Sequence, residues 1–153
     1  MTAQTNDTHS KTIGYLLWIF GFCGAHRFYY GKTKTGVLWF FTFGFFIVGW
    51  LVDLFLIPAM DRQADKRFEQ GPNDYTVSWA LLTFLWPFGA HRFYLGKIAS
   101  AICCLVCTAV GAALSPTGVF AIPFLVVPSV VALYDFLTLN RQIDELNRLA
   151  YSN

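Results

Sequence analysis

Residues 24–32 read Gly-Ala-His-Arg-Phe-Tyr-Tyr-Gly-Lys, and residues 89–97 repeat them as Gly-Ala-His-Arg-Phe-Tyr-Leu-Gly-Lys. Eight of these nine positions are identical at an offset of 65 residues, which chance does not plausibly supply. A short aromatic run precedes each copy, and a long apolar segment with one acid follows it, Asp53 in the first copy and Asp135 in the second. The chain is therefore a tandem duplication of one sequence unit.

The composition is typical of a protein that lipid surrounds. Of the 153 residues, 56% are hydrophobic, 18% are aromatic and only 13% are charged. A soluble domain has about 25% charged residues. A chain of this size has too little interior to hide 16 Phe, 7 Tyr and 5 Trp. The sequence predicts an all-α, polytopic integral membrane protein.

Segment lengths indicate how many helices cross the membrane. A spanning helix needs about 20 apolar residues, and residues 36–59 satisfy this. The stretches 13–25 and 75–90 are shorter, and they reach sufficient length if the aromatic residues of the motif continue the helix into the membrane interface. The prediction is two helical hairpins in tandem, with four core transmembrane helices.

The second copy is longer than the first. Lys32 and Asp53 are 21 positions apart, whereas Lys97 and Asp135 are 38 positions apart, so the second copy carries a 17-residue addition. The longer segment divides at Ser115-Pro116-Thr117-Gly118 into apolar halves 98–114 and 119–139. A fifth spanning helix, or a re-entrant hairpin, is the alternative.

Polar stretches divide the chain into five parts. We expect a polar N-terminal tail, a first two-helix domain, a polar linker, a second two-helix domain and a polar C-terminal segment; these are residues 1–10, 11–60, 61–74, 75–140 and 141–153. Positive charge is shared almost evenly between the two sides of the predicted membrane, so it sets no orientation. The apolar stretch near the N-terminus runs into the motif without a cleavage signal, so we expect it to be retained.

Several classes of site are disfavoured. A net charge of +2, without a basic block, disfavours nucleic-acid binding. The four cysteines lie inside apolar stretches without the polar neighbours that a metal site needs; they are Cys23, Cys103, Cys104 and Cys107. We expect them to pack between helices, and we expect neither a metal nor a cofactor.

The motif residues are the candidate site, because charge near hydrocarbon is costly and usually retained for a reason. One interpretation is interfacial anchoring, in which the arginines reach lipid phosphates and the aromatic rings lie among the headgroups or contact a partner. The residues concerned are His26, Arg27, Phe28, Tyr29, His91, Arg92, Phe93 and Tyr94. The other interpretation is a polar site shared with the intramembrane acids, in which Arg27 pairs with Asp53 and Arg92 with Asp135.

Geometry separates these interpretations. If residues 36–57 form one straight helix, Asp53 lies roughly 30 Å from the start of that helix, because each residue adds about 1.5 Å. Arg27 could not then reach it. A break near Gly44, or short tilted helices, would bring the two residues together, and the sequence does not choose between these arrangements.

The two motifs, together with Gly36 and Trp50-Leu51-Val52-Asp53, resemble the two-transmembrane-domain (TM-two) family. The resemblance covers about residues 10–60 and 75–140. The second copy departs from it by lacking a Trp before Asp135, where it has Ala132-Leu133-Tyr134, and by its 17-residue addition. It implies two membrane helices joined by a short loop in each copy, and a membrane location. Most bacterial members have no established biochemical activity, so the resemblance implies a fold more than a function.

The leading functional hypothesis is a noncatalytic membrane module that packs against other subunits, against itself and against lipid. An oligomeric pathway for ions or small solutes through the two acids is the alternative. A membrane enzyme using His26 or His91 as acid or base is disfavoured, because no nucleophile elbow, metal triad or phosphate loop accompanies them. The expected location is a bacterial cytoplasmic membrane.

Overall fold

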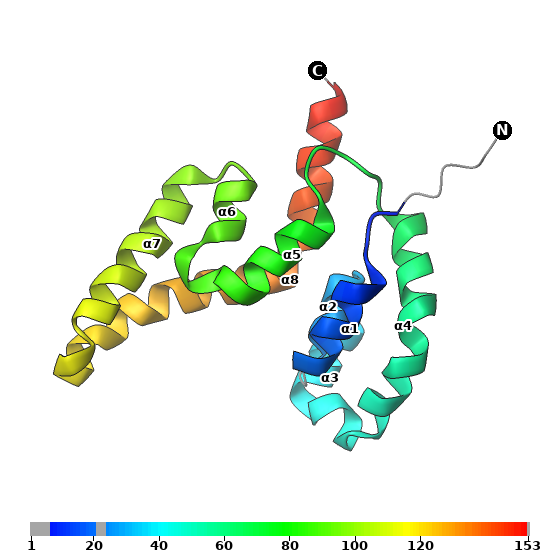
Figure 1. The fold of residues 1–153 in the computed structure, drawn as a ribbon, viewed down its shortest axis with the longest axis horizontal. Coiled ribbons are helices and arrows are strands. Elements are labelled where there is room, and N and C mark those ends of the chain that lie inside the picture. The colour runs from blue at the N-terminus through cyan, green and yellow to red at the C-terminus, as the bar shows by residue number, and fades with distance from the viewer. Residues whose placement is uncertain (1–6, 21–23, 153) are drawn as a thin grey trace. The chain divides into compact units, whose positions relative to one another are not determined.

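The computed structural model describes residues 7–20 and 24–152, with the side chains of Phe45 and Phe46 excepted. Every regular element in these residues is helical (Figure 1), as the sequence predicts. The elements are α1 (Lys11–Phe20), α2 (Ala25–Tyr29), α3 (Thr33–Phe46), α4 (Val48–Arg67), α5 (Tyr75–Leu85), the 3₁₀ helix η1 (Trp86–Phe88), α6 (Ala90–Tyr94), α7 (Ile98–Ala113), the 3₁₀ helix η2 (Ser115–Ala121) and α8 (Ile122–Ser152).

The chain forms two compact units. The first comprises residues 1–76 together with 140–153, and the second comprises residues 77–139. The helices α4 and α8 continue through the expected domain ends at residues 60 and 140, so the polar stretches 61–67 and 141–152 are helical extensions. The last part of α8 thereby belongs to the same unit as the first motif.

In the first unit, α1 packs against α2 and α4, and α3 packs against α4. The indole rings of Trp18 on α1 and Trp50 on α4 stack with their centroids 4.1 Å apart. Each indole N–H donates to the backbone carbonyl of the other tryptophan, at 2.8 and 3.0 Å. This reciprocal pair fixes α1 to the start of α4, close to Asp53.

The expectation of one spanning helix over residues 36–59 is wrong. The backbone has a positive φ at Phe43 (48°) and Gly44 (66°) in the last turns of α3, and again at Ile47 (74°), the residue that separates α3 from α4. The apolar run is therefore divided into α3 and α4, and α4 turns back to pack on α3. This break brings Asp53 near the motif.

Each motif forms a short helix of its own rather than the end of a longer one. Gly24 (φ 79°) and Gly89 (φ 65°) precede α2 and α6 in the left-handed conformation, which only glycine adopts without cost. A Cβ at these positions would also lie 2.7 Å from the Cβ of Trp39 and 3.0 Å from that of Cys104. The expected extension of residues 13–25 and 75–90 through the motif is therefore wrong; residues 21–23, including Cys23, lie outside the described residues.

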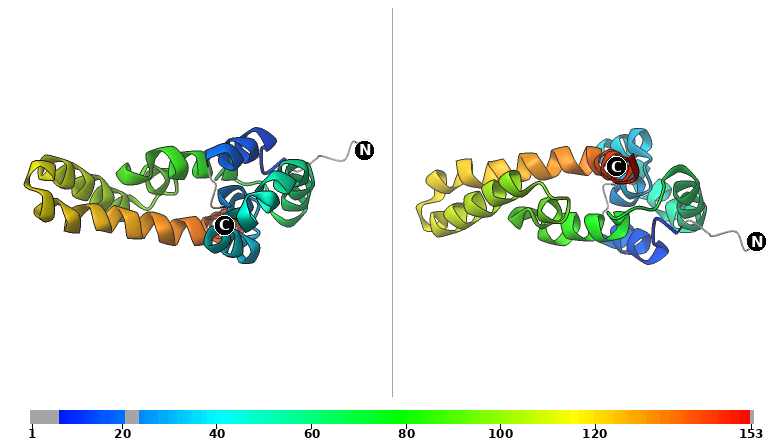
Figure 2. Two further views of the ribbon diagram at one scale, coloured as in Figure 1. Left: turned by 90° about the horizontal axis from the view of Figure 1, so that it is seen from below. Right: turned by 90° about the horizontal axis from the view of Figure 1, so that it is seen from above.

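The 17-residue addition lengthens existing elements of the second copy. The helix after the motif has 16 residues in α7 against 14 in α3, and the connection to the next helix has eight residues against one. Asp135 then lies 13 positions into α8, whereas Asp53 lies five positions into α4. Figure 2 shows α7 and α8 meeting at η2, where a Cβ on Gly111 would lie 2.8 Å from Leu125 Cδ2. Both copies thus have four α-helices in the same order within the described residues, and the second copy adds the 3₁₀ helices η1 and η2.

Among the described residues, only the helical stretch Ser115–Ser152 is long and apolar enough to cross a membrane, with a mean hydropathy of 2.0 over its 18-residue window. The helices α1 and α7 are apolar but shorter. The backbone breaks at the motif glycines and at Ile47 account for this, because they divide the other apolar runs. The arrangement with four spanning helices is not confirmed and stays a prediction.

Candidate functional site

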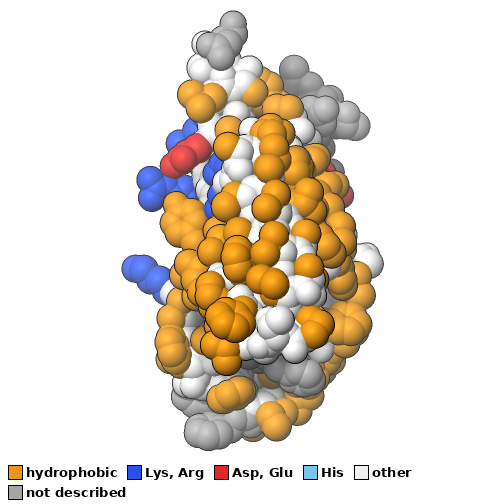
Figure 3. All heavy atoms as spheres, turned by 90° about the vertical axis from the view of Figure 1, so that its left-hand side faces the viewer, with side chains coloured by type: hydrophobic (Ala, Val, Ile, Leu, Met, Phe, Trp, Pro, Cys, Tyr) orange, Lys and Arg blue, Asp and Glu red, His pale blue; other side chains and the backbone are white. Residues whose placement is uncertain are grey.

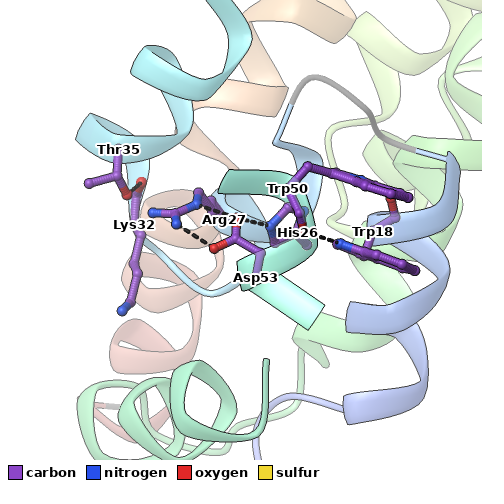
Figure 4. A network of polar contacts seen from close by, with 7 residues as sticks. All are labelled: Trp18, His26, Arg27, Lys32, Thr35, Trp50 and Asp53. Atoms are coloured by element: carbon purple, nitrogen blue, oxygen red, sulfur yellow. Dashed lines mark hydrogen bonds and ion pairs between the residues drawn. The ribbon is translucent and has the colours of Figure 1, made fainter. Parts of the chain in front are cut away.

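The first cluster joins the motif helix α2 to Asp53 on α4 (Figure 4). Arg27 donates from Nε to Asp53 Oδ2 at 2.7 Å and from Nη2 to Oδ1 at 2.5 Å, a bidentate pair. His26 Nε2 lies 2.8 Å from the same Oδ2. Asp53 and His26 are fully buried, and Arg27 is 7% exposed. Arg27 and Asp53 therefore meet, and of the two geometries that the sequence leaves open, the broken helix is the one present.

The second cluster repeats this geometry atom for atom. Arg92 donates from Nε to Asp135 Oδ2 at 2.6 Å and from Nη2 to Oδ1 at 2.8 Å. His91 Nε2 lies 2.7 Å from Oδ2. Asp135 and His91 are fully buried. Asp135 therefore occupies the same position relative to its motif as Asp53 does. The longer path outward through α7 and η2 is matched by the longer part of α8 that precedes the acid.

The carboxylates determine which ring nitrogen of each histidine donates a hydrogen bond. An ionised carboxylate only accepts hydrogen bonds, so Nε2 of His26 and of His91 carries the proton and donates to Asp53 or Asp135. The remaining ring nitrogen, Nδ1, is buried in both histidines and has no hydrogen-bond partner among the described residues. The two copies thus share a buried histidine nitrogen that makes no hydrogen bond to the described residues.

A buried ion pair of this kind acts as a structural clamp. Both charges must leave water, and their attraction compensates for this only with good geometry and further hydrogen bonds, as Asp53 has from two donors of Arg27 and one of His26. Loss of one partner leaves a buried charge unpaired, at a cost of about 3–5 kcal/mol. The clamp therefore holds the motif helix against the helix that carries the acid.

The surroundings of the two arginines differ. In the first unit the guanidinium carbon of Arg27 lies 3.7 Å from the ring centroid of Trp39, a cation–π contact. In the second unit the equivalent position, 65 residues later, is Cys104, which is buried and packs against Gly89. Among the described residues, the first arginine thus has a cation–π contact and the second has none.

The aromatic residues of the motif also differ between the copies. Phe28 is 3% exposed and Tyr29 is fully buried, so in the first copy these rings lie inside the unit. Phe93 and Tyr94 are 38% and 37% exposed. Contact of the motif rings with lipid or a partner therefore stays a prediction for Phe93 and Tyr94 alone.

Sequence reasoning missed the residues that cover the first motif. Asp65 Oδ1 accepts hydrogen bonds from the backbone N–H groups of Thr8 and His9, and the N–H of Ser10 donates to Tyr29 Oη at 2.6 Å. Asn140 Nδ2 on α8 donates to the carbonyls of Phe28 and Tyr29. No periodicity or spacing marks these contacts, because they join segments as far as 112 positions apart.

Two ionisable groups outside the apolar segments are also buried in the first unit. The ring of His9 stacks on Tyr75 and is 2% exposed. Burial removes water from this ring and lowers the pKa of His9 from 6.5 to about 4. Burial likewise raises the pKa of Asp61 from 3.8 to about 6, with the nearby Asp65 adding to the effect.

Neither cluster has the donor set of a metal site. Within the part of the chain that the structure describes, no three His, Cys, Asp or Glu side chains are grouped to hold a metal ion. Of the cysteines described, Cys103 is exposed, Cys104 is buried and Cys107 is intermediate, and all three are free.

Comparison with known proteins identifies the repeated unit. The TM2 domain family matches residues 7–55 and again residues 71–137, which together cover most of the chain. The chain belongs to the TM2 domain family. This is a family of membrane proteins, and the matched ranges contain both Arg–Asp–His clusters of the TM2 repeats.

Curated relatives of this TM2 protein are TM2 domain-containing proteins of Dictyostelium discoideum. One is 43% identical over 61 residues, which are 39% of this chain and 40% of the relative. Two others are 53% identical over 47 residues and 51% identical over 58 residues, covering 30% and 37% of this chain and 34% and 36% of the relatives. The chain thus matches less than half the length of each. No solved structure matches it.

Proposed function

We propose that this TM2 protein is a noncatalytic membrane module that acts as an accessory, assembly or interaction subunit through helix packing. The observation that carries the proposal is that both clusters are closed. Both oxygens of each buried carboxylate accept hydrogen bonds from the arginine of its own repeat, and one of them also lies against the histidine. A carboxylate held in this way is suited to fixing a fold and poorly suited to exchanging protons with a substrate.

The outer surface supports contact with lipid and with other helices. Figure 3 shows apolar side chains covering most of one face. Large apolar residues of α7, η2 and α8 are among the exposed ones: Ile102, Leu105, Val106, Val119, Phe120, Ile122, Leu125, Val126 and Val130. Exposed apolar area of this extent is typical of membrane proteins and of interfaces between subunits. Membrane lipid and a second protein, or a second copy, are the partners we propose.

The membrane location follows from the family, and the kind of membrane is a proposal. A bacterial cytoplasmic membrane stays a prediction, because the relatives named above come from Dictyostelium discoideum. Fractionation of the source cell, with detection of the full chain, measures this directly.

Affinity purification of the full chain in mild detergent tests the proposal. We expect a stable oligomer or a stoichiometric partner. Recovery of only a monodisperse monomer, with lipid alone, would contradict an assembly role.

The alternative is an oligomeric pathway for ions or small solutes. The unpartnered Nδ1 atoms of His26 and His91, each next to a buried acid, are what favours it. Flux through proteoliposomes that disappears in Asp53→Asn and Asp135→Asn variants of normal stability would support this alternative. An enzyme is less favoured, and the names of the relatives contain no enzymatic activity.

A further inference from the structure

The two motifs contain an equivalent glycine, and among the described residues a side chain packs on this glycine in the first motif and not in the second. Gly31 and Gly96 are the second-last residues of the two motifs, and both have a φ of 72°. A Cβ on Gly31 would lie 2.7 Å from Phe68 Cζ, so the phenyl ring of Phe68 packs directly on this glycine. A Cβ on Gly96 would have no atom within 4 Å. The second motif is therefore open where the first is in contact.

The cover on the first motif has a definite chemistry. Helix α4 ends at Arg67, which donates from Nη1 to the carbonyl of Gly31 at 3.1 Å, and Phe68 is the C-cap residue that follows. The guanidinium of Arg67 also lies 5.3 Å from the Phe68 ring centroid. The cover thus consists of an arginine–aromatic pair at the C-terminal end of a helix.

The second motif retains the groups that Arg67 and Phe68 contact in the first motif, a glycine without a side chain and its carbonyl. Residues 89–97 match residues 24–32 at eight of nine positions, and Gly96 offers the same carbonyl and the same absence of a side chain. Phe93 is 38% exposed, while its counterpart Phe28 is 3% exposed. An exposed aromatic ring beside an open glycine is a surface that a second aromatic ring can fill.

We infer that the surface formed by Phe93, Tyr94 and Gly96 is a docking site for a partner helix that ends in an arginine–aromatic pair. The aromatic ring packs on Gly96, and the guanidinium donates to the Gly96 carbonyl. This inference rests on the proposed function, because it states where an interaction subunit receives its partner and which chemistry selects that partner.

The probe is a fluorescent peptide with the sequence of residues 61–70, Asp-Arg-Gln-Ala-Asp-Lys-Arg-Phe-Glu-Gln. It is added to the full chain in detergent micelles, and binding is followed by fluorescence polarisation. The first motif is already covered by the same chain at a high effective concentration, so the peptide goes to the second. We expect saturable binding that weakens about tenfold or more with a Phe68→Ala peptide, as is usual for an anchoring aromatic residue.

Protein variants locate the binding. A Phe93→Ala, Tyr94→Ala variant should weaken binding of the unchanged peptide about tenfold as well. A matched variant, Val119→Ala with Phe120→Ala, removes apolar side chains that are 74% and 71% exposed and should bind as the original chain does. Benzoylphenylalanine in place of Phe93 should photolabel the peptide.

Four results would overturn the inference: no saturable binding, equal binding of the Phe68→Ala peptide, undiminished binding to the Phe93→Ala, Tyr94→Ala variant, or photolabelling only of lipid or of residues 1–76 of the same chain. Because the peptide variant acts on unchanged protein, the test does not depend on the folding of any protein variant. If affinity purification yields a partner or oligomer while the peptide fails, this inference falls and the proposed function stands.

Discussion

The two TM2 repeats form the same Arg–Asp–His clamp in surroundings that differ. In the first unit Arg27 lies against Trp39, and the motif is covered by Phe68 and Asn140. In the second unit Cys104 replaces the tryptophan, and Gly96 is open. The comparison shows that the clamp needs only the motif helix and the helix with the acid, whereas its cover is a separate feature that one repeat has and the other lacks.

The largest effect should come from removing an acid. In Asp53→Leu, Arg27 is left buried beneath Trp39 without its partner, and we expect a loss of about 3–5 kcal/mol in the free energy of unfolding. Asp135→Leu should cost less, because Arg92 lacks, among the described residues, the aromatic ring that holds Arg27 in place. Unfolding in mixed micelles, monitored by circular dichroism, measures both; a larger loss for Asp135→Leu would break the comparison.

The two motif glycines give the next largest difference. Gly96→Ala should cost about 1–2 kcal/mol, the price of placing a Cβ at a positive φ. Gly31→Ala has the same cost and in addition a clash with the Phe68 ring, which adds about 1–3 kcal/mol. The same unfolding assay compares the pair. Equal losses would show that Phe68 does not cover Gly31.

Exchange of the residue over the arginine has a smaller effect. Trp39→Cys gives the first repeat the residue found in the second, and it removes the cation–π contact at Arg27. We expect a loss of about 1–2 kcal/mol, because a partly desolvated contact of this kind contributes that much. Cys104→Ser serves as the matched control in the second unit. An unchanged free energy of unfolding in Trp39→Cys would show that the tryptophan ring does not stabilise the first clamp.

The pH dependence of stability should show the smallest net effect, because two groups of the first unit oppose each other. Between pH 6.5 and 4 the unfolded chain binds a proton at His9 that the folded chain refuses, so acidification destabilises the fold through His9. Between pH 6 and 4 the folded chain binds a proton at Asp61 that the unfolded chain refuses, so acidification stabilises it through Asp61.

Single substitutions separate these two contributions. His9→Phe should make stability rise as the pH falls from 6 to 4, relative to the unchanged protein, and Asp61→Asn should make it fall. Unfolding midpoints measured across this range check both signs. Identical pH profiles for all three proteins would contradict the burial of these groups.

The repeat, the helical class and the motif residues could be predicted from the sequence, because eight matching positions and the apolar composition are local signals. The meeting of Arg27 and Asp53 could only be posed as one of two geometries. The break that decides it includes Ile47 at φ 74°, a conformation that is rare for a β-branched residue and that no sequence pattern announces. Gly44 indicated where the helix could break, but not in which direction the chain would turn after the break.

The cover on the first motif was beyond sequence reasoning for a different reason. Phe68 lies in the polar stretch that was expected to be a linker, and Asn140 is the last residue of the expected second two-helix domain. Nothing in their spacing relates them to Gly31 or Tyr29. The number of spanning helices stays a prediction, since hydropathy measures how apolar a run is and not whether its backbone is continuous at the motif glycines.

The central claim is that Arg27 and Asp53 act as one unit, and a double-mutant cycle with Arg27→Met and Asp53→Leu tests it most directly. The account predicts that each single variant loses about 3–5 kcal/mol in the free energy of unfolding, because each leaves a buried charge unpaired. The double variant should lose clearly less than the sum, since no charge remains. Losses that simply add would contradict the clamp.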